Sequence, residues 1–420
     1  MNKSTAFIMT HEPDPNRTTP AMSIIALALT RSLGRRGVNV VRIHPNDMDY
    51  SLRSRFCRKV EICPDFYKSE DALLNYLLQL SAEYPEQRIL FPASDDTAYF
   101  LAKYKEELAL CYSVIVSDWE VMEKLTNKRL QYAEAEKIGI PIPETYFPST
   151  TQEVEKLSST LENYPYIIKP NVAHKWRLAS MQSVSKGKKA FIASTPRELV
   201  DRYRELGLEG HDVMIQERIG GRDERLYTFL CYFNSGSEPH AYCIRRKYRQ
   251  TPIDFGYCTS TVTCHNQSVE DLSVRLLSAI GFKGIGGVEW KLDPRTDAYK
   301  LIEINPRPVN TIGAAIAAGV DLPYIAFQDA SINDVAPKVS TWKDGVKWVW
   351  LTQDVWSAKE LHDKGLLSYW EWLKSIRGKK YHAIFAIDDL KPFVLSFLVY
   401  AREIISLKLQ KGIFPSRAKS

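Results

Sequence analysis

The chain has 420 residues, of which 45% are apolar and 25% are charged, and its formal net charge is +6. This length allows about two to four domains with cores of their own, and the composition is that of an ordinary globular protein. No long stripe of Lys and Arg is interleaved with aromatic residues, which argues against a nucleic-acid partner. The small positive charge suits acidic small ligands such as nucleotides.

The seven cysteines form no C-x-x-C pair, which argues against a disulfide framework or a zinc site and favours a reducing cytosol. The apolar stretch near the N-terminus, within MNKSTAFIMT, is too short for a signal peptide. No window of about eighteen uninterrupted apolar residues predicts a membrane span. We therefore expect a cytoplasmic protein.

The first part of the chain alternates short apolar strands with helices. Strands are expected at 6–9, 38–43, 89–92 and 113–117, and helices at 21–33, 71–80 and 97–109. This alternation predicts a Rossmann-like α/β domain, with a parallel sheet covered on both faces. No G-x-G-x-x-G follows the first strand, so a dinucleotide site is not expected.

The middle of the chain is richer in strands. After a helix at 127–138 and an extended, proline-containing segment, strands are expected at 166–169, 190–193, 213–217, 226–233, 240–246, 260–263, 287–292 and 299–305. Helices are expected only at 153–161, 196–205 and 268–280. This pattern predicts α+β domains built on antiparallel sheets.

Residues 391–412, KPFVLSFLVYAREIISLKLQKG, predict an apolar helix with basic residues toward both ends. Its apolar run is too short to cross a bilayer. Peripheral membrane contact, aided by Lys408, Lys411 and Arg417, is one interpretation. A helix docked on the body of the protein is the simpler one.

The strongest chemical signal is an expected hairpin, G-V-E-W-K-L-D from Gly287 followed by Y-K-L-I-E-I-N-P-R-P from Tyr299. Because side chains alternate along a strand, Glu303 and Asn305 share a face that Glu289 can reach from the partner strand. Two carboxylates and an amide oxygen suit Mg²⁺ or Mn²⁺, since Mg²⁺ also retains waters and phosphate oxygens.

Arg307 stands between two prolines directly after this hairpin. Its guanidinium could bind a transferring phosphoryl group or a substrate carboxylate in forked geometry. The alternative for the whole motif is a solvated acidic face. The apolar residues between the acids and the Pro-x-Pro stop argue against that alternative.

E-I-N-P-R-P, preceded by G-V-E-W-K-L-D, resembles the metal-binding end of the ATP-grasp superfamily, and the resemblance covers about residues 120–330. Within that superfamily, D-aspartate ligase and D-alanine–D-alanine ligase have the most similar layout. The resemblance implies Glu289, Glu303 and Asn305 as metal ligands and Arg307 as a catalytic residue.

Three upstream motifs extend the resemblance. L-T-N-K-R-L and Y-P-Y-I-I-K-P match the segments that carry the two phosphate-binding lysines, and M-I-Q-E-R-I-G-G-R-D-E matches the adenine hinge. The backbone of the hinge would read the adenine edge, and its carboxylates would face the adenine amino group and the ribose. The ATP-binding residues implied in this way are Lys128, Lys169, Gln216, Glu217, Arg218, Ile219 and Asp223.

Two basic segments complete the prediction. Where many relatives have a glycine- and serine-rich loop over the phosphates, this chain has charged residues that include Lys175, Arg177 and Lys189. R-R-K-Y-R, from Arg245, stands where related ligases bind the acid substrate, although a solvated face is the alternative. Arg245 and Lys175 thus join Arg307 as predicted catalytic residues.

The resemblance implies a pre-ATP-grasp α/β domain at 1–120, ATP-grasp lobes at 121–212 and 213–335, and an α-rich C-terminal extension at 336–420. It implies an ATP-dependent ligase that activates a carboxylate as an acyl phosphate and couples it to an amine, with amino acids among the candidate substrates. The alternatives are a carboxylase, a thioester-forming ligase, or a catalytically silent nucleotide-binding scaffold at a membrane surface. Peripheral membrane contact and a homodimer stay open.

Overall fold

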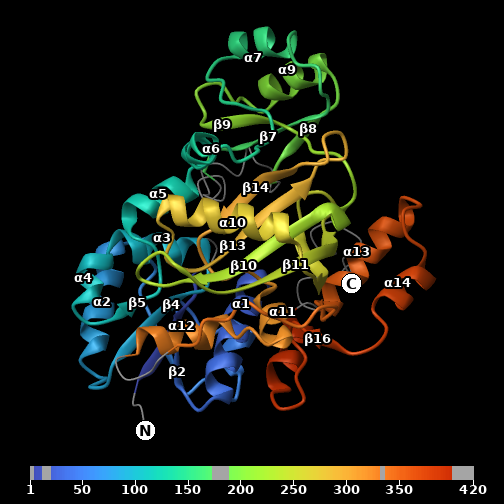
Figure 1. Ribbon diagram of the computed structural model, residues 1–420. Coiled ribbons are helices and arrows are strands. Elements are labelled where there is room, and N and C mark those ends of the chain that lie inside the picture. The colour runs from blue at the N-terminus through green and yellow to red at the C-terminus, as the bar shows by residue number, and fades with distance from the viewer. Residues whose placement is uncertain (1–3, 12–19, 173–188, 332–335, 400–420) are drawn as a thin grey trace, which may run out of the picture.

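The computed structural model describes residues 4–11, 20–172, 189–331 and 336–399. Their strands form three sheets, of five, four and seven strands. Figure 1 shows the four-stranded sheet and its helices standing above the seven-stranded sheet, with the N-terminal elements below. The candidate site lies where these parts meet.

The N-terminal sheet is parallel throughout, in the order β3-β2-β1-β4-β5. Its strands are β1 (Thr5–Met9), β2 (Asn39–His44), β3 (Lys59–Ile62), β4 (Arg88–Pro92) and β5 (Ser113–Val114). Alternate residues of β1 enter different cores, Ala6 and Ile8 with α1 (Pro20–Arg35), and Phe7 and Met9 with α2 (Glu70–Ser81). The predicted parallel sheet with two covered faces is therefore confirmed.

Two details of this domain were not expected. Strand β3, with the sequence K-V-E-I, lacks an apolar run, and its side chains are half-buried or exposed. The helix expected at 97–109 is two helices, α3 (Asp95–Lys103) and α4 (Lys105–Ala109), which meet at Tyr104. Helices α5 (Trp119–Thr126) and α6 (Lys128–Lys137) then lead to the next sheet.

The four-stranded sheet has the order β6-β9-β7-β8. Its strands are β6 (Thr145–Tyr146), β7 (Tyr166–Pro170), β8 (Phe191–Ala193) and β9 (Val213–Glu217). A compact core joins it to α7 (Thr151–Ser158) and α9 (Pro196–Glu205). The predicted lobe boundary at 212/213 is wrong, because β9 pairs with both β6 and β7 and so belongs to the first lobe.

The seven-stranded sheet has the order β14-β13-β10-β11-β12-β15-β16. Its strands are β10 (Leu226–Phe233), β11 (Pro239–Thr251), β12 (Tyr257–Thr263), β13 (Gly284–Leu292), β14 (Tyr299–Asn305), β15 (Lys347–Val349) and β16 (Lys380–His382). Helices α10 (Gln267–Ile280), α11 (Ile312–Ala318) and α12 (Leu322–Ala330) share its core. All neighbours pair antiparallel except β15 and β16.

The C-terminal extension is more than the α-rich segment predicted. It adds β15 and β16 to the large sheet and contributes α13 (Leu351–Asp363) and α14 (Tyr369–Ser375). Residues 391–399 are helical, and Phe393 packs against the cluster that holds Ile24 and Leu27 of α1. The docked interpretation thus fits the described part of the apolar helix, whereas 400–412 lie outside the described residues. Among the helices described, none is both long and apolar enough to cross a bilayer.

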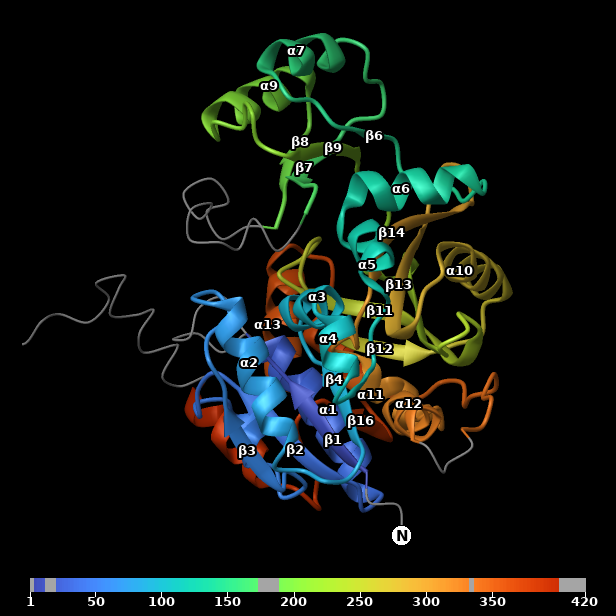
Figure 2. The ribbon, with the colours of Figure 1, turned by 90° about the vertical axis from the view of Figure 1, so that its left-hand side faces the viewer.

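The two lobes face each other around the hairpin of β13 and β14. Figure 2 shows α6 running across the end of β14, below the four-stranded sheet. The Tyr132 hydroxyl on α6 donates to the Ile302 carbonyl on β14 at 2.8 Å. This contact fixes the start of α6, and with it Lys128, relative to the acidic hairpin.

Candidate active site

The hairpin brings the three predicted metal ligands together. Glu289 on β13 and Glu303 on β14 are direct partners in the ladder, and Asn305 lies two residues beyond Glu303. Direct partners in an antiparallel pair project from the same face of the sheet. Gly287 is the partner of Asn305, so no side chain on β13 competes for the space beside the amide.

The same row continues across the large sheet to the basic cluster. Thr228 on β10 separates Glu289 from Arg245 on β11. An Arg245 guanidinium nitrogen lies 3.5 Å from Glu289 Oε1, and Lys247 Nζ lies 3.7 Å from Glu289 Oε2. Arg245 and Lys247 are only 1% and 4% exposed. The alternative of a solvated basic face therefore does not hold for these two residues.

The first lobe contributes two lysines to the acidic row. Lys128 begins α6, and its Nζ lies 3.3 Å from Glu303 Oε1. Burial lowers the pKa of Lys169 on β7 to about 7, and the nearby Lys128 adds to this effect while Glu303 opposes it. Burial disfavours the ionised form of Glu303, but Lys128 and Lys169 outweigh it and lower the pKa of that carboxyl.

Arg307 connects the row of Glu289, Glu303 and Asn305, which we call the acidic row or metal row, to the N-terminal domain. Its Nε donates to Asp95 Oδ1 at 2.6 Å, and its terminal nitrogens donate to Asn305 Oδ1 at 3.3 Å and to the Pro308 carbonyl at 3.0 Å. Asp95 is the first residue of α3, just after parallel strand β4. Sequence reasoning missed Asp95, although the carboxyl ends of parallel strands are where α/β sheets place ligand-binding residues.

Cations outnumber acids around this row. Lys291 on β13 also belongs to the site and was missed, although its spacing of two residues from Glu289 placed both on one face. Burial lowers the pKa of Lys291 to about 8, with a further contribution from Arg218. A set of buried cations with too few carboxylates to neutralise them favours a polyanionic ligand.

The donor set fits a hard divalent cation. Two carboxylates and one amide supply only oxygen, which Mg²⁺ prefers, and Mg²⁺ completes its octahedron with water and phosphate oxygens. Within the described ranges, no three His, Cys, Asp or Glu side chains gather as a metal site.

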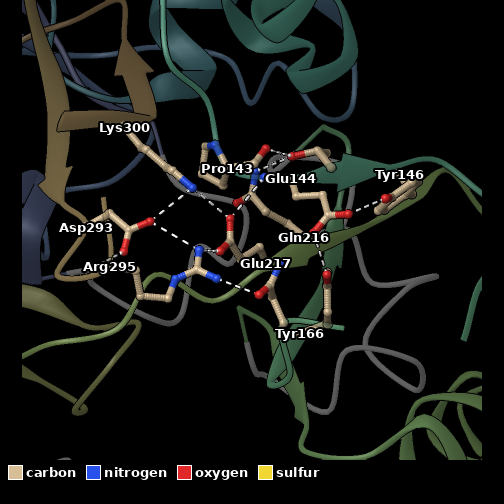
Figure 3. A network of polar contacts seen from close by, with 11 residues as sticks. Pro143, Glu144, Tyr146, Tyr166, Gln216, Glu217, Asp293, Arg295 and Lys300 are labelled. Atoms are coloured by element: carbon tan, nitrogen blue, oxygen red, sulfur yellow. Dashed lines mark hydrogen bonds and ion pairs between the residues drawn. The ribbon is translucent and has the colours of Figure 1, made fainter. Parts of the chain in front are cut away.

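Two side chains of the hinge have partners within the protein. The Gln216 amide donates to Thr145 Oγ1 at 2.8 Å and is 1% exposed. The Glu217 carboxylate pairs with Arg295 and, at 3.0 Å, with Lys300 of the β13–β14 hairpin (Figure 3). That carboxylate joins the first lobe to the hairpin turn, and its predicted contact with adenine stays a prediction.

The rest of the hinge keeps its place beside the site. The Arg218 guanidinium pairs with Asp254 at 2.6 Å, and its backbone N–H donates to the Pro165 carbonyl at 3.1 Å. Ile219 is buried. Asp223 accepts from Gln250 Nε2 at 2.7 Å. Burial raises the pKa of Asp223, although the positive charges of Lys247 and Lys291 oppose the shift.

The charged loop is only partly described. Lys175 and Arg177 lie outside the described residues, so their predicted phosphate contacts stay predictions. Lys189 stacks its ammonium over the Tyr257 ring, 3.7 Å from the ring centroid. Tyr257 is the first residue of β12. Lys189 therefore lies against the large sheet that carries the acidic row.

A separate pocket of about 570 Å³ lies between α6, β6 and the β13–β14 turn. Its charged lining includes Glu217, Arg295 and Lys300, which already pair with one another. None of the metal-row residues lines it. This pocket is therefore separate from the row of Glu289, Glu303 and Asn305.

Glu217→Ala is expected to lower the free energy of unfolding by about 2–4 kcal/mol, because it removes a buried carboxylate from two cations that it neutralises. Urea unfolding followed by circular dichroism measures the change. Arg204→Ala is the control, since its pair with Glu155 is about half exposed and is worth less than about 1 kcal/mol. Equal losses in the two variants would contradict the assignment of Glu217 to a stabilising network.

Comparison with known proteins supports the same fold. Residues 231–354 match the model of a family described as "ATP-grasp in the biosynthetic pathway with Ter operon". Over 319 residues the chain is 24% identical to the D-aspartate ligase of Enterococcus faecium, and the match covers 73% of this chain and 74% of that protein.

Two solved structures illustrate the likeness. An L-amino acid ligase from Bacillus licheniformis superposes with a TM-score of 0.55 at 15% identity, covering 79% of this chain and 74% of the other. N5-carboxyaminoimidazole synthetase from Staphylococcus aureus gives a TM-score of 0.61 at 14% identity, covering 86% and 87%. At such identities the structures demonstrate a common fold. Residues 231–354 therefore resemble an ATP-grasp family in sequence, and the chain shares its fold with these two solved structures.

Proposed function

We propose that the protein is an ATP-dependent ligase that phosphorylates a carboxylate and couples the resulting acyl phosphate to an amine. The observation that carries the proposal is the row of Glu289, Glu303 and Asn305, facing Lys128 and Lys169 across the lobes. Oxygen ligands beside buried cations suit a metal–triphosphate complex. The relatives named above, D-aspartate ligase and L-amino acid ligase, make amino acids the first candidate substrates.

Each group at the row has a proposed task. Glu289, Glu303 and Asn305 would hold Mg²⁺, which would neutralise charge on the phosphate oxygens. Lys128 and Lys169 would bind the phosphates from the first lobe, and Arg245 would orient the acid substrate. Arg307 would stabilise charge on the transferring phosphoryl group, while Asp95 fixes the orientation of its guanidinium.

The chemistry balances in two steps. A carboxylate oxygen of the acid attacks the γ-phosphorus of ATP, the bond to the β-phosphate oxygen breaks, and ADP leaves. The amine nitrogen then attacks the acyl carbon, inorganic phosphate leaves, and the amine gives up one proton. Because positioning and electrostatics provide most of the rate, these side chains need no covalent role.

The proposed parts of the chain follow the sheets. The first lobe runs from α5 through Glu217, and the second runs from Asp223 through the edge strands that the C-terminal extension supplies. The extension is thus part of the second lobe. A homodimer and a membrane surface as partner stay predictions.

ADP release by the purified protein, measured against panels of acids with hydroxylamine as the amine, tests the proposal. The expected result is ADP formation that depends on one class of acid, with a hydroxamate as product, because hydroxylamine captures acyl phosphates. Bicarbonate belongs in the panel, since a carboxylase would respond to it and to no amino acid. The absence of ADP with every acid would overturn the proposed ligase.

A further inference from the structure

Helix α13 of the C-terminal extension contacts strand β11 where the pairing of β11 with β12 is irregular. The pairing of β11 with β12 shifts register between Lys247 and Arg249 and again between Arg249 and Gln250. A bulge of this kind interrupts the ladder and leaves a strand with fewer backbone bonds to fix it. The position of Arg249 and Gln250 must therefore be set by other contacts.

Asp354 of α13 supplies the first of these contacts. Its carboxylate is fully buried and accepts two hydrogen bonds from Arg249, at 2.9 and 2.8 Å. It also accepts from Thr259 Oγ1 on β12 at 2.7 Å and from Trp372 Nε1 on α14 at 2.8 Å. A buried carboxylate with four donors holds its partners in one geometry, since losing any bond leaves an unpaired buried group.

Two more residues of α13 hold the chain just beyond Arg249. Ser357 Oγ donates to the Gln250 carbonyl at 2.8 Å, and Glu360 accepts from the Ile253 backbone N–H at 3.1 Å. Spacings of three residues place Asp354, Ser357 and Glu360 on one face of the helix. One face of α13 thus fixes three successive points of β11 and the loop after it.

The Gln250 side chain connects these contacts of α13 to the candidate site. Its side-chain nitrogen donates to Asp223 Oδ1 at 2.7 Å, and its side-chain oxygen accepts from Lys247 Nζ at 3.2 Å. Lys247 in turn lies beside Glu289 of the metal row. Asp223 and Lys247 are the groups that would meet the ribose and phosphates if the proposed function holds.

We propose that α13 is a positioning element of the nucleotide site, acting through Asp354 and Ser357 on Gln250, and through Gln250 on Asp223 and Lys247. The hydrogen bonds described for Asp354, Ser357 and Glu360 do not include Glu289, Glu303 or Asn305. The inference rests on the proposed ATP site, and it assigns nucleotide affinity to a helix beyond the second lobe's core. The helix would therefore support the nucleotide site through the residues that it positions.

Titration of the full-length protein with MgADP, by isothermal calorimetry, tests the proposal. Asp354→Asn is expected to raise the Kd about tenfold or more and Ser357→Ala about threefold, as the loss of buried hydrogen bonds implies. At saturating ATP, kcat should stay near the wild-type value, because the metal row is intact. A purely structural role would lower thermal stability without moving Kd or the KM for ATP.

Asp389→Asn is the matched control. Asp389 is another buried carboxylate of the same C-terminal segment, and it holds Arg31 of α1 at 2.9 Å and Ser54 at 2.7 Å. Its loss should lower thermal stability much as Asp354→Asn does, yet leave the Kd for MgADP unchanged. An equal rise in Kd for the control would overturn the proposal, because it would make the effect a general consequence of loosening the segment.

A double-mutant cycle keeps the test decisive if Asp354→Asn does not fold. Gln250→Ala alone should raise the Kd for MgADP, and adding Ser357→Ala to it should change the Kd no further, because both act through one side chain. Additive effects on the Kd, or a wild-type Kd in Ser357→Ala, would overturn the positioning role of α13 and leave the proposed function standing. A wild-type protein that binds no MgADP would overturn the proposed function as well.

Discussion

Glu303→Gln should reduce the rate of ADP formation about a thousandfold or more, because it removes a charge that the metal and the phosphates need at the reacting centre. Glutamine keeps the shape of the side chain, so the hairpin of β13 and β14 should still form. Single-turnover measurements at saturating ATP give the rate, and Mn²⁺ titration by electron paramagnetic resonance reports metal affinity directly. Both readouts should fall together.

A control acid separates this effect from a general loss of charge. Glu270 lies on α10 and accepts the Tyr242 hydroxyl at 2.9 Å, away from the row. Glu270→Gln should therefore retain the wild-type rate. Full activity in Glu303→Gln, or equal losses in the two variants, would contradict the metal assignment.

The pH dependence of stability gives a second signature of Glu303. Since its pKa is lowered in the folded protein, its ionised form stabilises the fold at neutral pH, and this contribution is lost as the pH falls through that lowered pKa. Glu303→Gln should therefore lower Tm at pH 7, with the difference from wild type vanishing in strong acid. Differential scanning calorimetry across this range checks the sign.

Lys169→Met should weaken MgADP binding about a hundredfold, because a buried ammonium that pairs with phosphate is replaced by an apolar group. The same substitution should stabilise the free protein by roughly 1–2 kcal/mol at pH 6. This value is smaller than the free energy that corresponds to the whole pKa shift, because the side chain is partly exposed and solvent screens its charge. The free protein carries Lys169 as a partly buried cation next to Lys128, and the attraction of Glu303 does not offset the cost of its burial. We propose that phosphate binding, and not stability, accounts for this charge.

The sign follows from the pKa of Lys169, which falls from 10.5 to about 7 on folding. Below pH 7 the ammonium is charged in both states, and the folded state bears the full cost of burying it. As the pH rises from 7 toward 10.5, the folded state loses the proton first and the cost declines. The stabilisation by Lys169→Met should therefore be largest at pH 6 and small near pH 10.

Lys156→Met provides the comparison for both measurements. Lys156 is an exposed lysine on α7 of the same lobe, so its loss should change neither MgADP binding nor the pH profile of stability. If Lys169→Met also left MgADP affinity unchanged, Lys169 would have no role in phosphate binding. A fall in stability at pH 6 would show that its ammonium has a partner in the free protein.

The hairpin was predictable because its signals are local. Alternation within V-E-W-K and L-I-E-I-N fixed which side chains share a face, and the Pro-x-Pro stop fixed where the strand ends. The ladder pairs Glu289 with Glu303 as that pattern implies. Strands β9, β10 and β14 likewise begin and end where the sequence placed them.

The sheet to which each strand belongs was harder to predict, because strands that pair can lie far apart in the sequence. V-M-I-Q-E reads as a strand in any sheet, and only its pairing with β6 and β7 assigns it to the first lobe. The orientation of Glu217 was equally hidden, because its partners Arg295 and Lys300 are far along the chain. Asp95 could not be linked to Arg307, from which 212 positions separate it.

Short strands of the extension escaped prediction for a different reason. Lys347–Val349 and Lys380–His382 have three residues each, too few for alternation to register above the background of the sequence. Strand β15 forms because β12 already offers a row of backbone donors and acceptors, and β16 then pairs with β15. Their presence is dictated by the sheet and not by their own composition.

The place of β15 has one more consequence. By pairing with β12, it closes an edge that would otherwise present free N–H and C=O groups to any passing chain. A shortened protein that ended before Lys347 would keep every side chain of the metal row and still expose that edge. Such a fragment would be prone to self-association through strand addition. The C-terminal extension therefore protects the protein against aggregation in addition to completing the sheet.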